Sequence, residues 1–217
     1  MQEKRNLAMI SGEIVKGIEY SHEIFGERFY TTEIHVTRSS GTADRIPVMI
    51  SDRMTNITHM NIGDILCVEG QFRSFNRHDG EKNRLELFLF AMELKVIEKI
   101  DDKIKNNQIF LDGYICKEPV YRKTPLGREI TDVLLAVNRS YNKSDYIPCI
   151  FWGRNARCVA GANVGTRLKI TGRIQSREYS KRISENEYET KTAYEVSISK
   201  LEVIDGEERK DQVSDAE

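Results

Sequence analysis

The sequence predicts an all-β protein made of two similar small domains in tandem, each with one short helix. Three observations lead to this prediction. The chain repeats itself after about 100 residues, each copy consists of short runs rich in branched and aromatic residues, and only one segment of each copy fits a helix. A chain of 217 residues has room for two domains of this size.

The internal repeat is the strongest of these observations. Residues 6–12 resemble residues 107–113 at an offset of 101, which becomes 102 after one inserted residue. The identities in register pair Asn6 with Asn107, Gly12 with Gly113, Gly26 with Gly127, Arg38 with Arg139, Pro47 with Pro148, Arg53 with Arg154, Gly63 with Gly165 and Gly70 with Gly172. A period of this length is too long for a solenoid repeat, so each copy is expected to be a complete domain.

Each copy predicts five strands and one helix. In the second copy the strands are expected at 109–115, 130–137, 146–152, 168–174 and 188–203. The helix is expected at Gly153–Ala160, between the third and fourth strands, and its counterpart in the first copy is Asp52–Met60. This order matches the five-stranded Greek-key barrel called the OB-fold. The nearest rival is an SH3-like barrel, which usually lacks that helix.

These elements divide the chain into four parts. Residues 1–99 form the first OB-fold domain, 100–106 a linker and 107–204 the second domain. Residues 205–217 read DGEERKDQVSDAE, a composition typical of a disordered acidic tail.

Several classes of protein do not fit the sequence. There is no phosphate-binding loop, dinucleotide fingerprint, HExxH or GxSxG motif, so the sequence predicts no enzyme and no cofactor. The four cysteines lack CxxC spacing, which argues against zinc and against a disulfide framework. No apolar run approaches the roughly 20 residues that a membrane span needs, and the first residues lack a signal-peptide pattern. We therefore expect a cytoplasmic protein.

Charge is distributed unevenly along the chain. Residues 1–106 hold 15 Lys/Arg and 17 Asp/Glu, residues 107–182 hold 14 and 6, and residues 183–217 hold 4 and 11. The three regions thus carry net charges of −2, +8 and −7, although the whole chain carries −1. A basic middle region indicates an anionic partner, with plain solvation of surface strands as the alternative.

Aromatic residues alternate with cations in this basic region. Tyr146 and Trp152 lie six residues apart on one predicted strand, so both point to the same side, opposite Ile147, Cys149 and Phe151. Further aromatics occur in Tyr121-Arg122-Lys123, which opens a loop, in Arg139-Ser140-Tyr141 and in Arg177-Glu178-Tyr179, which each end a strand. Aromatic faces stack on unpaired bases while Lys and Arg follow the phosphates, so the pattern favours single-stranded nucleic acid.

At this point the second copy resembles the bacterial single-stranded DNA-binding protein family. The resemblance rests on residues 119–127, 135–139, 146–156, 164–165 and 170–179, in that order. It implies that Tyr141, Tyr146, Trp152 and Tyr179 stack on bases. It also implies an assembly of four barrels around one strand, hence a homodimer of this two-barrel chain that works in DNA replication, recombination and repair, in association with the nucleoid.

The first copy departs from this pattern. Arg45 stands at the position of Tyr146, Ser51 at that of Trp152, Ser40 at that of Tyr141 and Arg77 near that of Tyr179. Four phenylalanines fit core positions: Phe25, Phe29, Phe72 and Phe75. The tail lacks the Pro-Phe tip with which the family recruits replication and repair proteins, so recruitment by this route is in doubt.

The sequence therefore predicts a non-catalytic protein that binds single-stranded DNA with little sequence preference. The predicted contacts are Arg122, Lys123, Arg139, Tyr141, Tyr146, Trp152, Arg154, Arg173, Arg177 and Tyr179 in the second copy, and Arg38, Arg45, Arg73 and Arg77 in the first. The alternative is a primosome-like or recombination mediator protein whose main surface binds another protein. Exposure of Tyr146, Trp152 and Tyr179 on one face would favour DNA, and burial in an interface would favour the alternative.

Overall fold

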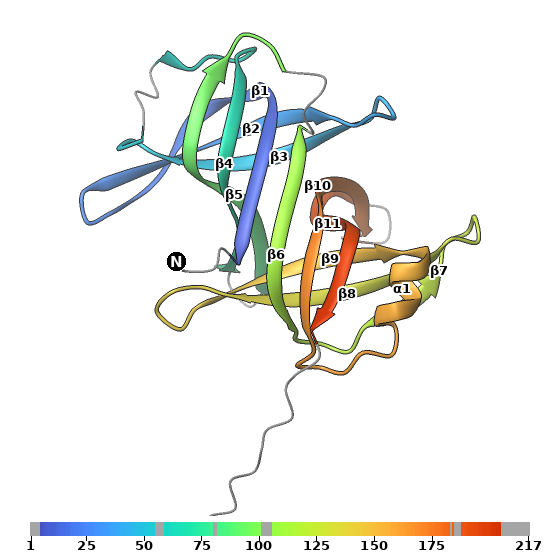
Figure 1. Cartoon of the computed structure of the whole chain (residues 1–217). Coiled ribbons are helices and arrows are strands. Elements are labelled where there is room, and N and C mark those ends of the chain that lie inside the picture. Colours follow the sequence, from blue (N-terminus) through green and yellow to red (C-terminus); the bar gives the residue numbers. More distant parts are fainter. Residues whose placement is uncertain are drawn as a thin grey trace, which may run out of the picture.

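Strands dominate the computed structural model, which describes residues 5–54, 59–79, 82–100, 106–182, 184 and 188–204 (Figure 1). The first half holds β1 (Asn6–Ile24), β2 (Glu27–Thr37), β3 (Ala43–Ser51), β4 (Ile65–Asp79) and β5 (Lys82–Ile97). The second half holds β6 (Asn107–Ile115), β7 (Val120–Lys123), β8 (Glu129–Asn138), β9 (Ser144–Trp152), α1 (Gly153–Val159), β10 (Arg167–Arg182) and β11 (Tyr188–Ile204).

The strands close into two rings. In the first ring the order is β2-β3-β5-β4-β1, and β1 pairs with β2 to close it. In the second the order is β6-β10-β11-β9-β8, and β6 pairs with β8. The only parallel pairs are β3 with β5 and β9 with β11, at equivalent places in the described parts of the two rings. Both rings therefore have the predicted OB-fold connectivity, and we call them the first and second barrels.

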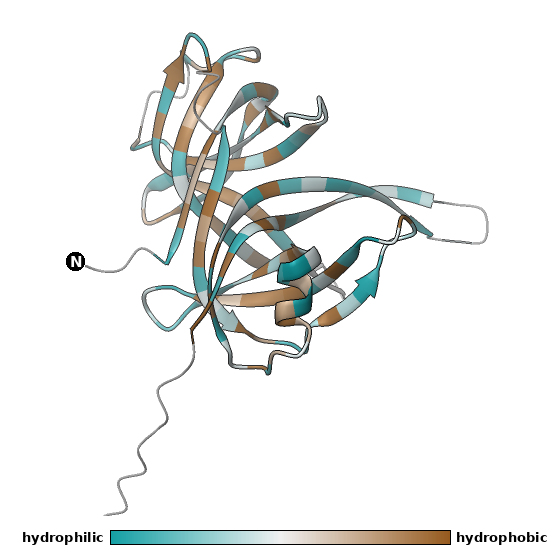
Figure 2. Ribbon diagram, turned by 45° about the vertical axis from the view of Figure 1, so that its right-hand side comes forward, coloured by the Kyte–Doolittle hydropathy of each residue, from teal (hydrophilic) through white to brown (hydrophobic). Residues whose placement is uncertain are grey.

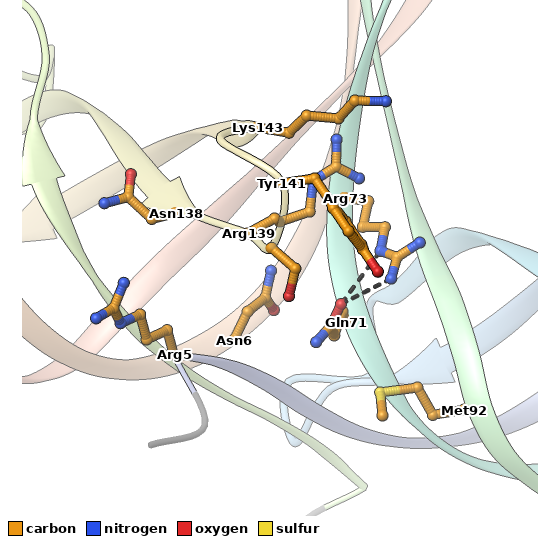
Figure 3. A pocket seen from close by; sticks show the side chains of 10 residues that line it. Arg5, Asn6, Gln71, Arg73, Met92, Asn138, Arg139, Tyr141 and Lys143 are labelled. Carbon is orange, nitrogen blue, oxygen red and sulfur yellow. Dashed lines mark hydrogen bonds between the residues drawn. The ribbon is translucent and has the colours of Figure 1, made fainter. Parts of the chain in front are cut away.

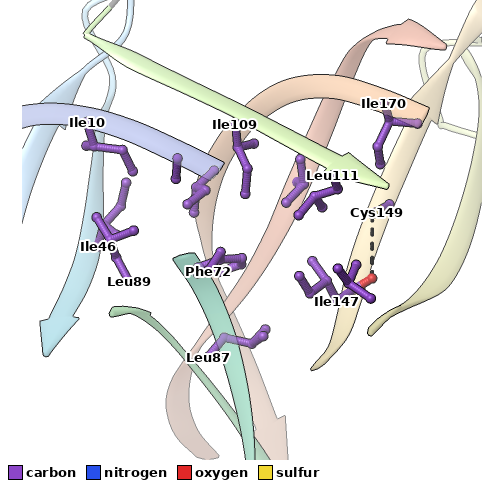
Figure 4. Packing of buried hydrophobic residues seen from close by; sticks show 14 of the residues in the cluster. Ile10, Ile46, Phe72, Leu87, Leu89, Ile109, Leu111, Ile147, Cys149 and Ile170 are labelled. Atoms are coloured by element: carbon purple, nitrogen blue, oxygen red, sulfur yellow. Dashed lines mark hydrogen bonds between the residues drawn. The ribbon is translucent and has the colours of Figure 1, made fainter. Parts of the chain in front are cut away.

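Alternation of side chains explains why these segments form strands. Along β9, Ile147, Cys149 and Phe151 are buried as predicted, while Tyr146 on the other face is exposed. The ribbon coloured by hydropathy shows the same alternation of apolar and polar residues on most strands (Figure 2). The inward residues of both barrels form one continuous apolar core, which runs from Ile10 and Ile46 past Phe72 to Ile147 (Figure 4).

The first strands of the two barrels pair with each other. β1 and β6 run antiparallel, from Asn6 opposite Leu111 to Ile10 opposite Asn107, so all strands form one sheet. This pairing joins the two barrels within a single chain. It also removes an exposed edge from each barrel.

Within each barrel, one asparagine makes contacts that repeat across the duplication. The Asn6 side chain accepts a hydrogen bond from the Phe72 amide (3.0 Å) and donates one to its carbonyl (2.8 Å). Asn107 makes the same pair with Ile174, at 2.9 and 2.7 Å. The repeated asparagine thus holds β4 to β1 and β10 to β6 by the same two bonds.

The hairpins β4–β5 and β10–β11 each reach across to the other barrel. In the first, Ser74 accepts a hydrogen bond from the Tyr146 amide (2.8 Å) and donates its own amide to Asp145 (2.8 Å). In the second, the Ser176 hydroxyl accepts a hydrogen bond from the Arg45 amide (3.0 Å), and the Ser176 amide donates one to Asp44 (2.7 Å). The two barrels are therefore related by an approximate twofold axis.

Three local predictions need correction. Residues 121–123 do not open a loop but lie in the short strand β7, where they pair antiparallel with residues 129–131 of β8. β10 continues to Arg182, so Tyr179 lies within a strand and does not end one. Phe25 and Phe75 are exposed, by 100% and 57%, and only Phe29 and Phe72 belong to the core.

Other predictions fall partly or wholly outside the described residues. The second-barrel helix is confirmed at Gly153–Val159, whereas residues 55–58 of its expected counterpart are not described. Residues 101–105 of the linker and the acidic tail 205–217 are not described either. Within the described part of the chain, no helix has the length and apolar character to cross a membrane.

Candidate nucleic-acid interface

The aromatic side chains predicted to bind bases lie on the outer face of the second barrel. Tyr146 on β9 and Tyr179 on β10 are each 40% exposed, and the Arg177 guanidinium lies 5.9 Å from the centre of the Tyr179 ring. Trp152 is half-buried, and its indole N–H donates to the Ser197 hydroxyl at 3.0 Å. Its ring is thus held in place by β11, which the sequence did not show.

Tyr141 occupies the turn between β8 and β9. Its side chain is 95% exposed, and its backbone has a positive φ of 62°, which non-glycine residues rarely adopt. The Arg139 amide donates to the Lys143 carbonyl at 2.7 Å and closes the turn. The turn therefore presents a tyrosine ring outward between two cations.

The cations of the second barrel differ in how free they are. Lys123, Arg154 and Arg173 are exposed. Arg122 is also exposed but pairs with Asp132 at 2.7 Å. An exposed ion pair of this kind contributes little to stability, so a phosphate can replace the carboxylate at small cost.

In the first barrel the predicted cations are more often bound to other side chains. Arg38 binds both carboxylate oxygens of the buried Asp44, at 2.7 and 2.5 Å, and so serves the structure. Arg45 is exposed and donates to His35 at 3.1 Å. Arg77 is exposed and lies 3.4 Å from Glu86.

Phe75 was missed by the sequence analysis. On β10, the alternate residues 173, 175, 177 and 179 read Arg, Gln, Arg, Tyr, and on β4 the equivalent residues 71, 73, 75 and 77 read Gln, Arg, Phe, Arg. On the hairpin β4–β5, Phe75 thus lies among cations as Tyr179 does on β10–β11. It stands two residues before the position equivalent to Tyr179. Comparing whole strand faces, instead of single positions, would have found it.

A pocket at the junction of the two barrels brings three predicted residues together (Figure 3). Arg73 comes from the first barrel, and Arg139 and Tyr141 come from the second. The pocket measures about 640 Å³. Its other lining residues, none of which the sequence analysis predicted as a contact, are Arg5, Asn6, Gln71, Met92, Asn138, Ser140 and Lys143.

Positive charge is crowded in this pocket. Arg73 packs its guanidinium 3.8 Å from the centre of the Phe90 ring, and its pKa is lowered by burial first and by repulsion from Arg139 second. Burial raises the pKa of the nearby Asp145 carboxyl. The Arg139 Nε and Asp145 Oδ2 atoms are 3.4 Å apart but make no hydrogen bond.

The His, Cys, Asp and Glu side chains of the described residues form no group of three or more that could hold a metal ion. All four cysteines are free, and burial raises the pKa of the Cys149 thiol.

Comparison with known proteins identifies relatives of the second barrel. A family model described as "Single-strand binding protein family" matches residues 106–204. Single-stranded DNA-binding protein B of Bacillus subtilis is 36% identical over 95 residues, covering 39% of this chain and 80% of that protein. The chain belongs to the single-strand binding protein family. The Enterococcus faecalis single-stranded DNA-binding protein is 33% identical over 96 residues, which are 41% of this chain and only 51% of that protein.

The family match is confined to the second barrel, and the likeness of the first is structural. A crystal structure of the single-stranded DNA binding protein from Thermus aquaticus superimposes with a TM-score of 0.70. The match covers 93% of this chain and 94% of that chain at 20% identity. The two-barrel fold is therefore shared with that protein, while the family model matches the second barrel.

Proposed function

We propose that this protein binds single-stranded DNA without catalysis and with little sequence preference. The observation that carries the proposal is the set of exposed tyrosines among cations on the second barrel: Tyr141, Tyr146 and Tyr179. Their exposure also favours DNA binding over a mediator whose main surface binds protein. The names of the bacterial relatives support the same reading.

The physical basis is stacking combined with charge neutralisation. Every base has a π-face, so Tyr146 and Tyr179 stack on any of them, each contributing about 1–3 kcal/mol. Trp152 stacks through the part of its ring that is not covered by β11. Arg122, Lys123, Arg154, Arg173 and Arg177 contact phosphates, which makes the affinity depend on salt.

We propose that the protein takes part in DNA replication, recombination and repair by coating single strands in the cytoplasm. We also propose a homodimer that presents four barrels, for which light scattering would give twice the chain mass of 25.1 kDa.

The test uses the chain's only tryptophan. Trp152 fluorescence is expected to be quenched when oligo-dT is added, and Tyr146→Ala is expected to weaken binding by about 1–3 kcal/mol because one stacking face is lost. Tyr20→Ala is the matched control, since Tyr20 is 59% exposed but lies on the β1–β2 hairpin among glutamates. Equal loss in both variants, or no binding by the wild type, would contradict the proposal.

A further inference from the structure

The pocket at the barrel junction has an internal reference, because the duplication places an equivalent junction on the other side of the approximate twofold axis. Three cations of the pocket have neutral counterparts there. Arg5 corresponds to Asn106, Arg73 to Gln175 and Lys143 to Thr42. Only Gln71 reverses the trend, since its counterpart is the exposed Arg173.

Carboxylates balance the charge at the reference junction but not in the pocket. At the reference junction Arg38 is bound by both oxygens of Asp44, and Gln175 donates to Glu195 at 2.6 Å. In the pocket, by contrast, the buried Asp145 lies beside both Arg139 and Arg73. Arg5 lies near Asp112, but both oxygens of that carboxylate are already bound by Arg167. The ten lining residues include four cations and no carboxylate. The half-buried Arg73 and Arg139 thus share one carboxylate, and the exposed Arg5 and Lys143 add further positive charge at the rim.

Such an excess is costly unless an anion shares the site. Removing a guanidinium from water is unfavourable, and two of them side by side repel each other. Arginine forks bind phosphate oxygens in pairs of parallel hydrogen bonds, which suits Arg73 and Arg139. Figure 3 shows the Arg73, Arg139 and Lys143 side chains gathered around Tyr141.

We infer that this pocket holds a phosphate group of the DNA backbone where the strand passes from the second barrel to the first. The inference rests on the proposed function and adds a fixed crossing point for the strand. Arg73 and Arg139 hold the phosphate, and Lys143 and Arg5 add positive charge around it. Tyr141 at the rim stacks on the neighbouring base. The volume of about 640 Å³ has room for the phosphate and for part of the adjoining sugar.

The experiment compares the salt dependence of oligo-dT binding, with an oligonucleotide long enough to span both barrels. Arg73→Gln installs the residue of the reference junction. It is expected to flatten the slope of log K against log salt by about 0.7, the value for one phosphate contact on a single strand. Lys143→Gln is expected to flatten the slope in the same sense. Because Lys143 is exposed, this variant tests the site even if Arg73→Gln unfolds after losing its contact with Phe90.

Lys16→Gln provides the matched control. Lys16 is a cation of the first barrel, outside the pocket and paired with Glu19 at 2.9 Å, and its slope is expected to equal that of the wild type. Unchanged slopes in both pocket variants, with normal binding by the wild type, would overturn the inference while leaving the proposed function intact. Failure of the wild type to bind oligo-dT would instead remove the proposed function itself.

A second arm distinguishes a strand phosphate from a free anion. Pyrophosphate is added and the midpoint of thermal unfolding is followed for the wild type and Lys143→Gln. If pyrophosphate stabilises the wild type but not the variant, while the DNA slope of the variant stays unchanged, the pocket takes a free phosphate and the strand assignment is wrong. If Lys143→Gln flattens the slope of log K against log salt for oligo-dT, and pyrophosphate competes with oligo-dT, the assignment to a strand phosphate is supported.

Discussion

Where the second barrel carries Tyr146 and Trp152, the first carries Arg45 and Ser51, although the surrounding strands superimpose in register. Ser51 is 4% exposed and donates to the Glu27 carboxylate, so no ring could occupy its place without displacing that contact. Trp152 instead donates to Ser197 and keeps part of its ring at the surface. The same backbone frame, meaning the strand pairing common to both barrels, thus supports two surfaces of different chemistry.

The features that both barrels retain are those that fix the backbone. Asn6 and Asn107 make the same two hydrogen bonds, and Gly70 and Gly172 lie where a strand passes close to a carbonyl. A Cβ atom on Gly70 would lie 2.2 Å from the Phe90 carbonyl oxygen, and one on Gly172 would lie 2.3 Å from that of Ser197. Duplication therefore preserved the contacts that close the barrels and released the outward side chains.

The largest effect is expected from breaking this shared frame. Gly70→Ala and Gly172→Ala should each lower the free energy of unfolding by about 3 kcal/mol or more, because the added methyl group meets backbone that cannot move aside. Urea denaturation monitored by circular dichroism measures both.

The matched control for these glycines is Gly17→Ala. Gly17 lies in β1 with nothing within 4 Å of the added atom, so a change within about 0.5 kcal/mol is expected. If only one of Gly70→Ala and Gly172→Ala were destabilising, the frames of the two barrels would not be equivalent.

The next effect sharpens the comparison of the two hairpins. Tyr179→Ala is expected to weaken oligo-dT binding by about 1–3 kcal/mol, the loss of one stacking face. Phe75→Ala should have an effect in the same range, because Phe75 is 57% exposed on the equivalent face of β4. Fluorescence titration at fixed salt measures both losses.

Wild-type affinity in Phe75→Ala, with a clear loss in Tyr179→Ala, would show that only the second barrel binds bases. In that case the first barrel would act through its cations and its contacts with the second. Far-ultraviolet circular dichroism serves as the control that both variants remain folded.

The fold was predictable because its signals are local or repeated. Alternation identified β8 and β9, the repeat offset identified the second barrel as a copy of the first, and the order of strands around α1 indicated the OB-fold. The same local patterns could not show how far β10 extends, because its outer part pairs only with β11 and buries few side chains.

The site was predictable only in part. Tyr146 and Tyr179 were predicted as aromatics among cations, and both are exposed. Nothing near Trp152 in the sequence indicated its bond to Ser197, 45 residues away. The meeting of Arg73 with Arg139 depends on the twofold arrangement of the barrels, which no single strand encodes.

The smallest effect concerns an ion pair that exists in one barrel only. Arg167 donates to both oxygens of Asp112 at 2.8 and 2.7 Å, and this bonding holds the pKa of that carboxyl below its ordinary value. The first barrel has Ser11 and Ile65 at these positions. A depressed pKa means that the folded state favours the ionised form, so the stabilisation is present above the ordinary aspartate pKa of about 3.9 and is lost as the pH falls through the depressed value. Asp112→Asn should therefore be less stable than the wild type by on the order of 1 kcal/mol at pH 6, with a difference that shrinks below about pH 4. Urea denaturation of both proteins across this range measures it, and a difference that grew as the pH fell would show that Arg167 does not stabilise the ionised carboxylate.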